Sequence, residues 1–187
     1  MSGRPVVEPV ASTGVVFQTA NLLPWRSVAG NLGLGMEIRG ASKEAIARRL
    51  VDTVATLGLQ GFEDRFPHEL SGGMRQRVAI GQALMRDPEI LLMDEPFGAL
   101  DALTRDRLNV ELLRIWQAAR KTVVLVTHSI PEAVFLSDRV LVMSERPGRL
   151  VEDVAIELPR PRDPKTTREA PAFGRYVVRL GELMGIV

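Results

Sequence analysis

The sequence predicts an α/β fold with a mostly parallel sheet, because short apolar runs alternate with stretches of helical periodicity. Three of these runs, at residues 13–17, 123–126 and 140–143, are expected to be buried strands. Short continuous apolar runs are typical of parallel strands that are covered on both faces. With 187 residues, of which 45% are hydrophobic, the chain is long enough to bury a substantial core.

Local signals place two of the helices. The first is expected between Ser42, a candidate N-cap, and Gly58, a candidate C-terminal stop, with Val54 and Leu57 in its apolar stripe. The second is expected to begin after Asp101, another potential cap. Helices placed between strands in this way favour parallel pairing of the strands.

The composition excludes several classes of protein. The 24 basic and 23 acidic residues give a net charge of +1 with no long block of one sign, which does not suggest a nucleic-acid partner. The absence of cysteine excludes disulfides and thiolate metal sites. No apolar run approaches the roughly 20 residues that span a bilayer. Membrane association is therefore expected only through a partner.

Two adjacent carboxylates follow a fourth apolar run. Asp94 and Glu95 come directly after residues 90–93, so a strand would deliver both to the carboxyl edge of the sheet, where ligands bind in parallel α/β folds. The alternative is an acidic loop that caps the following helix.

A serine and two glycines precede another helical stretch. Ser71, Gly72 and Gly73 would leave N–H donors exposed at a helix N-terminus, an arrangement suited to a phosphate. An ordinary capped helix could use the same three residues.

Two polar residues follow predicted strands. Gln18 comes after the first strand, and His128 ends the strand at residues 123–127, where its imidazole could donate to a phosphate. A solvated loop glutamine and a satisfied structural histidine are the alternatives.

Together these segments resemble the ABC-type ATPases. The run from Leu70 to Arg77, Leu-Ser-Gly-Gly-Met-Arg-Gln-Arg, lies at the family's distance from the run that ends in Asp94, Glu95 and Pro96. The resemblance implies three sets of site residues: the catalytic residues Glu95, His128 and Gln18; the nucleotide-binding residues Ser71, Gly72, Gly73, Gln76 and Asp101; and the Mg²⁺ ligands Asp94 and Gln18. It also implies that Glu95 polarises the attacking water, and that residues 98–101 form a loop crossing a dimer interface.

Three further segments, residues 23–28, 131–139 and 143–149, resemble the importer ATPases for nitrate, sulfonate and taurine. Importers of pyrimidine or vitamin precursors share these features. The resemblance implies ATP and Mg²⁺ as cofactors. The implied partners are membrane permease subunits, a second ATPase subunit, either a copy of the chain or an intact homologue, and indirectly a solute-binding protein. Its implied location is the cytoplasmic face of the cell membrane.

One family motif is missing. The phosphate-binding loop G-x-x-x-x-G-K-[ST] needs a Gly-Lys step, and Lys43, Lys121 and Lys165 all follow other residues. We therefore expect a chain that is N-terminally truncated relative to the family, without the β subdomain and the phosphate loop; residues 3–6 resemble the end of the segment after that loop.

Such a truncation has consequences for stability and activity. It should uncover sheet edge and apolar surface, so that the isolated chain is unstable or aggregates. It also argues against ATP hydrolysis by the chain alone. The alternative function is a non-catalytic subunit that docks on a permease, or one that supplies only the signature half of a composite ATP site.

The expected organisation has three parts. Residues 1–158 form a partial ATPase domain, with a helical subdomain at about 19–86 that carries the signature. Residues 159–171 form a linker rich in proline and arginine. Residues 172–187 form a C-terminal helix, which is expected to pack on the body; contact with a membrane or a partner is the alternative.

Overall fold

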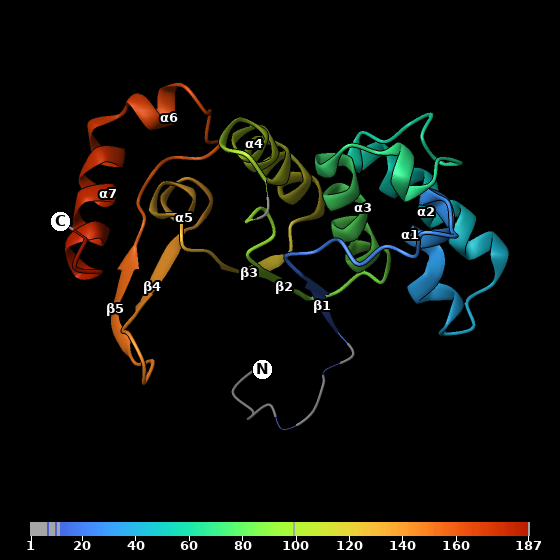
Figure 1. Ribbon diagram of the computed structural model, residues 1–187, viewed down its shortest axis with the longest axis horizontal. Coiled ribbons are helices and arrows are strands. Elements are labelled where there is room, and N and C mark those ends of the chain that lie inside the picture. The colour runs from blue at the N-terminus through green and yellow to red at the C-terminus, as the bar shows by residue number, and fades with distance from the viewer. Residues whose placement is uncertain (1–6, 8–9, 11, 99, 187) are drawn as a thin grey trace. The chain divides into compact units, whose positions relative to one another are not determined.

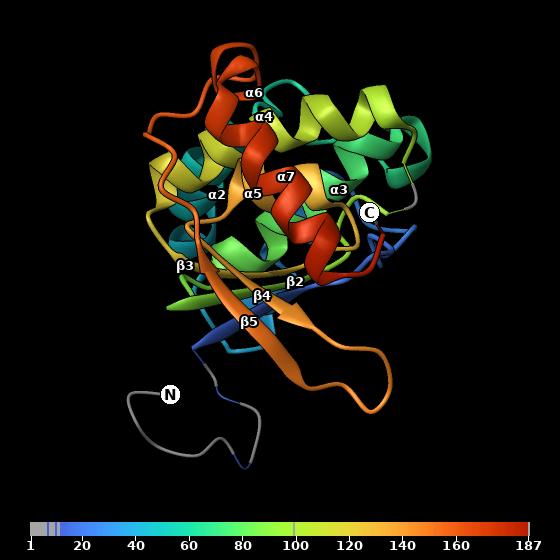
Figure 2. The ribbon, with the colours of Figure 1, turned by 90° about the vertical axis from the view of Figure 1, so that its left-hand side faces the viewer.

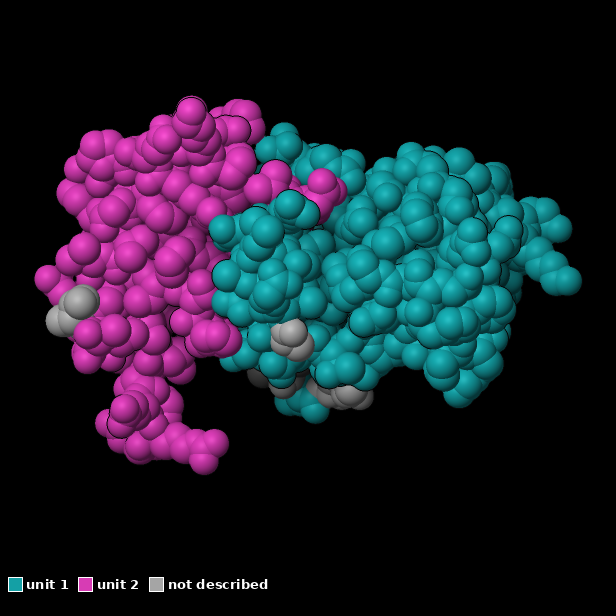
Figure 3. Space-filling view, turned by 45° about the horizontal axis from the view of Figure 1, so that its top comes forward, with its two compact units in different colours: residues 1–108, 114–126 teal, residues 109–113, 127–187 magenta. Residues whose placement is uncertain are grey.

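The computed structural model describes residues 7, 10, 12–98 and 100–186. Residues 3–6 and Ala99, on which part of the family resemblance rests, lie outside the described residues. The chain divides into two compact units, which Figure 3 shows in different colours: one has residues 1–108 and 114–126, the other residues 109–113 and 127–187.

The first unit is built on a parallel sheet, which confirms the predicted fold class. Its strands β1 (Thr13–Val16), β2 (Ile90–Asp94) and β3 (Thr122–Val126) lie in the order β1-β2-β3, with β2 in the middle (Figure 1). Val15 pairs with Leu92, which pairs with Val124. Because all three strands run in the same direction, their carboxyl ends meet at one edge of the sheet.

Three helices of this unit pack on one another. They are α1 (Val28–Glu37), α2 (Lys43–Leu57) and α3 (Gly72–Met85), with a 3-10 turn at Pro67–Glu69 before α3. The predicted ends of α2 are confirmed: Ser42 accepts from the N–H of Ala45, and Gly58 is left-handed. All three helices meet at Gly81, where an added Cβ would lie 2.4 Å from Leu57 Cδ1 and 2.5 Å from a methyl group of Leu32.

Helix α3 covers one face of the sheet. A Cβ at Gly14 of β1 would lie 3.1 Å from the Cβ of Ala83, so strand and helix approach closely. Val16, Leu91 and Met93 are buried on this face. The helix and strands together form the hydrophobic core of the unit.

The opposite face of the sheet is open, which corrects the expectation of fully buried strands. Val15, Leu92 and Val124, which are neighbours across the three strands, are 46%, 38% and 50% exposed, and Val126 is 54% exposed. The physical reason is that α3 packs on the other face of the sheet. Apolar surface and sheet edge are thus uncovered among the described residues.

Helix α4 (Ala102–Ala119) follows β2 and contains residues of both units. Its predicted cap is confirmed, since Asp101 Oδ1 accepts from the N–H of Thr104 at 2.9 Å. The helix ends at Arg120, which is left-handed, and Trp116 Nε1 donates to the carbonyl of Lys121.

The second unit has a sheet of its own. Strands β4 (Arg139–Met143) and β5 (Leu150–Ala155) form an antiparallel hairpin, which is seen lengthwise in Figure 2. The unit also contains α5 (Ile130–Leu136), α6 (Thr166–Glu169) and α7 (Pro171–Leu183). The strand expected at residues 140–143 is therefore present, and its partner is the next strand along the chain, because the short turn at residues 144–149 folds it back.

The C-terminal helix packs on its own unit, as expected. Phe173 and Leu180 of α7 are buried, and the hydroxyl of Tyr176 accepts from the N–H of Glu157. The stretch expected to be a linker contains α6 and a buried arginine. Arg162 donates to the carbonyls of Phe135 and Ser137, which satisfies the end of α5.

The open face yields a prediction about solubility. Val124→Lys places a charge on this face. We expect the light scattering of the variant, and its binding of a dye specific for apolar surface, to be lower than those of the wild type by a factor of about two or more. The reason is that a lysine on an edge strand disfavours stacking and pairing of sheets. Val178→Lys is the matched control, since Val178 on α7 is similarly exposed, at 55%. Equal scattering by the two variants would show that the open face does not drive association.

Candidate functional site

The two carboxylates lie at the end of the central strand. Asp94 is the last residue of β2 and is exposed. Glu95 follows with a positive φ of 42°, which ends the strand, and its N–H donates to the carbonyl of Val126 at 2.9 Å. The backbone therefore turns between the two acids and separates the directions of their side chains.

Gln18 lies beside Glu95, and Gly98 is where they meet. A Cβ added to Gly98 would lie 2.9 Å from Gln18 Nε2 and 3.0 Å from Glu95 Oε2. The register explains the approach, because Val16 pairs with Met93 and the two chains continue side by side. The structure thus brings Gln18 and Glu95 together, and it adds Gly98 as a residue whose lack of a side chain leaves room for both.

Ser71 caps the start of α3. Its Oγ accepts from the N–H of Met74 at 3.2 Å, and Ser71 itself is exposed. A Cβ at Gly72 would lie 3.2 Å from Leu100 Cδ2, which is a tight approach, whereas one at Gly73 would make an ordinary contact with Leu108 at 3.5 Å. The first N–H groups of α3 form an electropositive end suited to an anion.

Two other candidate residues, Gln76 and His128, differ in their surroundings from the residues described above. Gln76 is 4% exposed, and its Nε2 donates to the carbonyl of Phe17 at 3.3 Å, so its amide is turned into the protein. His128 belongs to the second unit, where it lies exposed just before α5. The contact of Gln76 with Phe17 could not be found from sequence, because a glutamine in a motif gives no indication of which way it points.

Asp101 has an altered ionisation. The N–H of Thr104, with help from its hydroxyl, lowers the pKa of the Asp101 carboxyl below its ordinary value. Its capping role is compatible with the predicted role in a loop across a dimer interface.

Asp94 fits a metal ion that is mostly coordinated by a nucleotide. Among the residues that the structure describes, no three acidic or histidine side chains gather into a metal site. Mg²⁺ is usually bound by one or two carboxylates together with phosphate oxygens and water. An exposed carboxylate such as Asp94 at the sheet edge is a ligand of that kind.

Comparison with known proteins decides the family. The sequence matches the ABC transporter family over residues 4–98. The chain belongs to this family. A relative in Methanocaldococcus jannaschii, an uncharacterized ABC transporter ATP-binding protein, is 55% identical over 183 residues, which are 96% of the chain and 67% of the relative.

Two relatives have named cargoes. The taurine import ATP-binding protein TauB of Rhizobium johnstonii is 46% identical over 92% of the chain and 68% of its own length. The aliphatic sulfonates import ATP-binding protein SsuB of Bacillus licheniformis is 42% identical over 92% of the chain and 65% of its own length. The chain thus spans about two thirds of the length of these relatives, and by family it is an ATP-binding protein of the importer type.

The described part of the chain has no helix that is both long and apolar enough to cross a membrane. ATP-binding subunits of importers work with membrane permease subunits, and partnership of this kind is what the family implies.

The contact at Gly98 yields a prediction. Gly98→Ala places a methyl group against the ends of two flexible side chains, so we expect Gln18 and Glu95 to move while the thermal midpoint changes by less than about 2 °C. The measurement is the side-chain amide resonance of Gln18 by NMR. Gly174→Ala, at a position on α7 with open space, is the control that should leave this resonance unchanged.

The cap at Asp101 yields a prediction about pH. Because the folded pKa is lowered, the stabilisation is present above the ordinary pKa of 3.8 and is lost as the pH falls through the folded pKa. At pH 7, Asp101→Ala should lower the thermal midpoint by about 2–4 °C, and the difference should shrink in acid. Asp101→Asn, which still caps, should stay near the wild type at pH 7. A difference that does not change with pH would contradict this account.

Proposed function

We propose that the chain is the ATP-binding subunit of an ABC importer that takes up a small solute such as taurine, another sulfonate or nitrate. The named cargoes of the TauB and SsuB relatives support this class of solute. The subunit acts on the cytoplasmic face of the cell membrane, where it pairs with a second ATPase subunit and docks on permease subunits. A solute-binding protein takes part indirectly, and nucleic acid is not a partner.

The observation that carries the proposal is the group at the carboxyl edge of the first sheet. Gln18 and Glu95 converge on Gly98, and Asp94, directly before Glu95, is the last residue of β2. In the proposed reaction, Asp94 and Gln18 would hold Mg²⁺, which would neutralise charge on the phosphate oxygens of ATP. Glu95 accepts a proton from the water that attacks the γ-phosphorus of ATP, so that ADP and phosphate are released.

The remaining candidates have roles in the same reaction. His128 donates a hydrogen bond to the γ-phosphate. Ser71, Gly72 and Gly73 bind the γ-phosphate of a nucleotide held by the opposite subunit, through the N-terminal end of α3. Asp101 links the two sites across the dimer.

A second candidate function follows from the missing Gly-Lys step. In a pair with an intact subunit, the chain would supply the signature half of one composite site, and the intact subunit would supply the phosphate loop and the general base. Isologous pairing makes this possible, since each site combines different segments of the two subunits. In that site Ser71 matters and Glu95 does not.

A mixing experiment tests both functions. We would combine the chain with the intact TauB of Rhizobium johnstonii, altered at its own signature serine so that TauB alone is inactive. If the composite site is correct, the mixture shows Mg²⁺-dependent ATP turnover and neither protein alone does, since removing a single phosphate-binding or oxyanion contact typically costs about 10²-fold or more in rate.

Two variants of the chain distinguish the functions. Ser71→Ala should abolish turnover by the mixture, whereas Glu95→Gln should leave it unchanged if the chain supplies only the signature half. Turnover by the chain alone that Glu95→Gln abolishes would instead show a complete ATPase. If unaltered TauB turns over ATP but the mixture does not, the composite site is wrong.

A further inference from the structure

A buried arginine of the second unit holds the C-terminal end of α5. The side chain of Arg162 is fully buried. Its Nη1 donates to the carbonyls of Phe135 and Ser137 at 3.1 and 2.7 Å, and to that of Val134 at 3.4 Å. These carbonyls lie in the last turn of the helix and just beyond it, where no N–H of the helix is left to bind them. One guanidinium therefore takes the place of a further helical turn.

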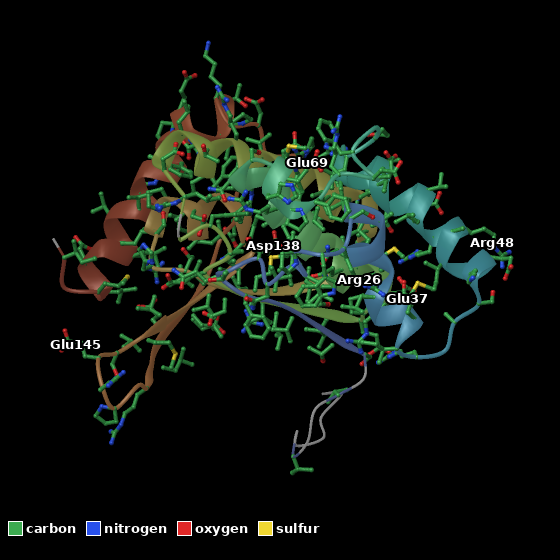
Figure 4. All side chains as sticks on the ribbon, turned by 45° about the vertical axis from the view of Figure 1, so that its right-hand side comes forward. Arg26, Glu37, Arg48, Glu69, Asp138 and Glu145 are labelled. Carbon is green, nitrogen blue, oxygen red and sulfur yellow. The ribbon has the colours of Figure 1, made fainter. Side chains whose placement is uncertain are left out.

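A second arginine and a carboxylate lie beside this contact. Arg160 Nη2 donates to the carbonyl of Leu136 at 2.8 Å, and its Nε lies 2.8 Å from Asp138 Oδ1. Arg162 Nη2 lies 3.5 Å from the same oxygen. Asp138, which Figure 4 labels, lies between the end of α5 and the start of β4. Its negative charge offsets the repulsion between the two guanidinium groups.

Arg162 stays charged although it is buried. Burial, and then the charge of Arg160, lower the pKa of Arg162 to about 10, and Asp138 acts in the opposite direction. The guanidinium therefore keeps its proton at neutral pH. Hydrogen bonds from a charged donor are stronger than neutral ones, and a buried charge that loses them is costly. The C-terminal end of α5 is thus held firmly in one place.

Packing alone does not hold α5 in this way. Val134 and Phe135 are completely buried, and the guanidinium of Arg168 lies 4.9 Å from the centroid of the Phe135 ring. Apolar contacts have no preferred direction, so they press the helix against its neighbours but allow it to slide or turn slightly. The hydrogen bonds of Arg162 are directional, and they fix the helix along its axis.

The other end of α5 carries His128. Ser129 is the N-cap, since its Oγ accepts from the N–H of Glu132 at 3.4 Å, and its own N–H donates to Thr127 Oγ1 at 3.0 Å. These two bonds join the backbone on both sides of His128 to the first turn of the helix. At a rise of 1.5 Å per residue, the seven residues of α5 span only about 10 Å, so the helix moves as one body.

We propose that Arg162 is a positioning residue for His128, which it holds through α5. Arg162 fixes the C-terminal carbonyls of the helix, and the helix sets where the imidazole lies. The stretch at residues 159–171, expected from the sequence to be a linker, thereby has a part in placing a site residue. The role of His128 towards the γ-phosphate rests on the proposed function, whereas its link to Arg162 does not.

NMR of the imidazole resonances of the whole chain, without nucleotide, tests the inference. The chain has two histidines, so His68 of the first unit is an internal reference, and His68→Gln assigns the signals. Arg162→Met keeps the length of the side chain and removes the donors. In this variant the His128 resonance should shift or split, and residues 130–137 should exchange their amide hydrogens about tenfold faster or more. The His68 resonance should stay unchanged.

Arg162→Lys is the second variant, which decides the question if Arg162→Met does not fold. It keeps the charge, but an ammonium group does not bind two carbonyls as the planar fork of arginine does. The His128 resonance should therefore shift in the same direction by a smaller amount.

Val154→Ala is the matched control. Val154 on β5 is buried in the same unit, so its truncation lowers stability, but it removes no hydrogen bond to α5. It should leave the His128 resonance at its wild-type position. A wild-type resonance in both arginine variants would overturn the proposal, as would an equal shift in Val154→Ala, which is the mark of a general structural role. Because no nucleotide is used, failure here leaves the mixing experiment with TauB unaffected.

Discussion

The parallel pairing of β2 with both neighbouring strands is the constraint on which the site depends. Val16 lies opposite Met93, and Asp94 lies opposite Val126, so all three strands end at the same level. The N–H of Glu95 then bonds to the carbonyl of Val126 and extends the pairing by one step. A slip by one residue would turn every side chain to the other face and move Asp94 from the exposed face to the one that packs on α3.

Helix α3 connects this sheet edge to the rest of the first unit. Its close approaches need small residues: Gly81 lets α1 and α2 reach the helix, and Ala83 meets Gly14 of β1. Its polar contacts need long side chains, since Gln76 reaches the carbonyl of Phe17 and Gln82 reaches the carbonyl of Asn31. Packing fixes the distance of α3 from the sheet, and the two glutamines fix its alignment with the segment that carries Gln18.

Local rules were sufficient to predict the features that depend on near neighbours in the chain. The caps at Ser42 and Asp101 and the left-handed stop at Gly58 follow from preferences within a few residues. The direction of Gln76 and the exposure of Val124 depend on which elements lie beside them, and no local pattern carries that information. Likewise, the hydrogen bonds of the Asn31 side chain to Leu23 and Arg26 link residues whose types are common in any polar loop.

The geometry of the two acids gives a physical basis for assigning them different roles. Asp94 still obeys the strand's alternation, so it shares the exposed face of the sheet with Leu92. Glu95 has left the strand through its positive φ, and its carboxylate lies instead at Gly98 with the amide of Gln18. One acid is therefore open to an ion and its water, while the other has a neighbour that can help to orient a single water molecule. Adjacent carboxylates that pointed the same way would repel one another and compete for one ligand, and the left-handed turn at Glu95 prevents this.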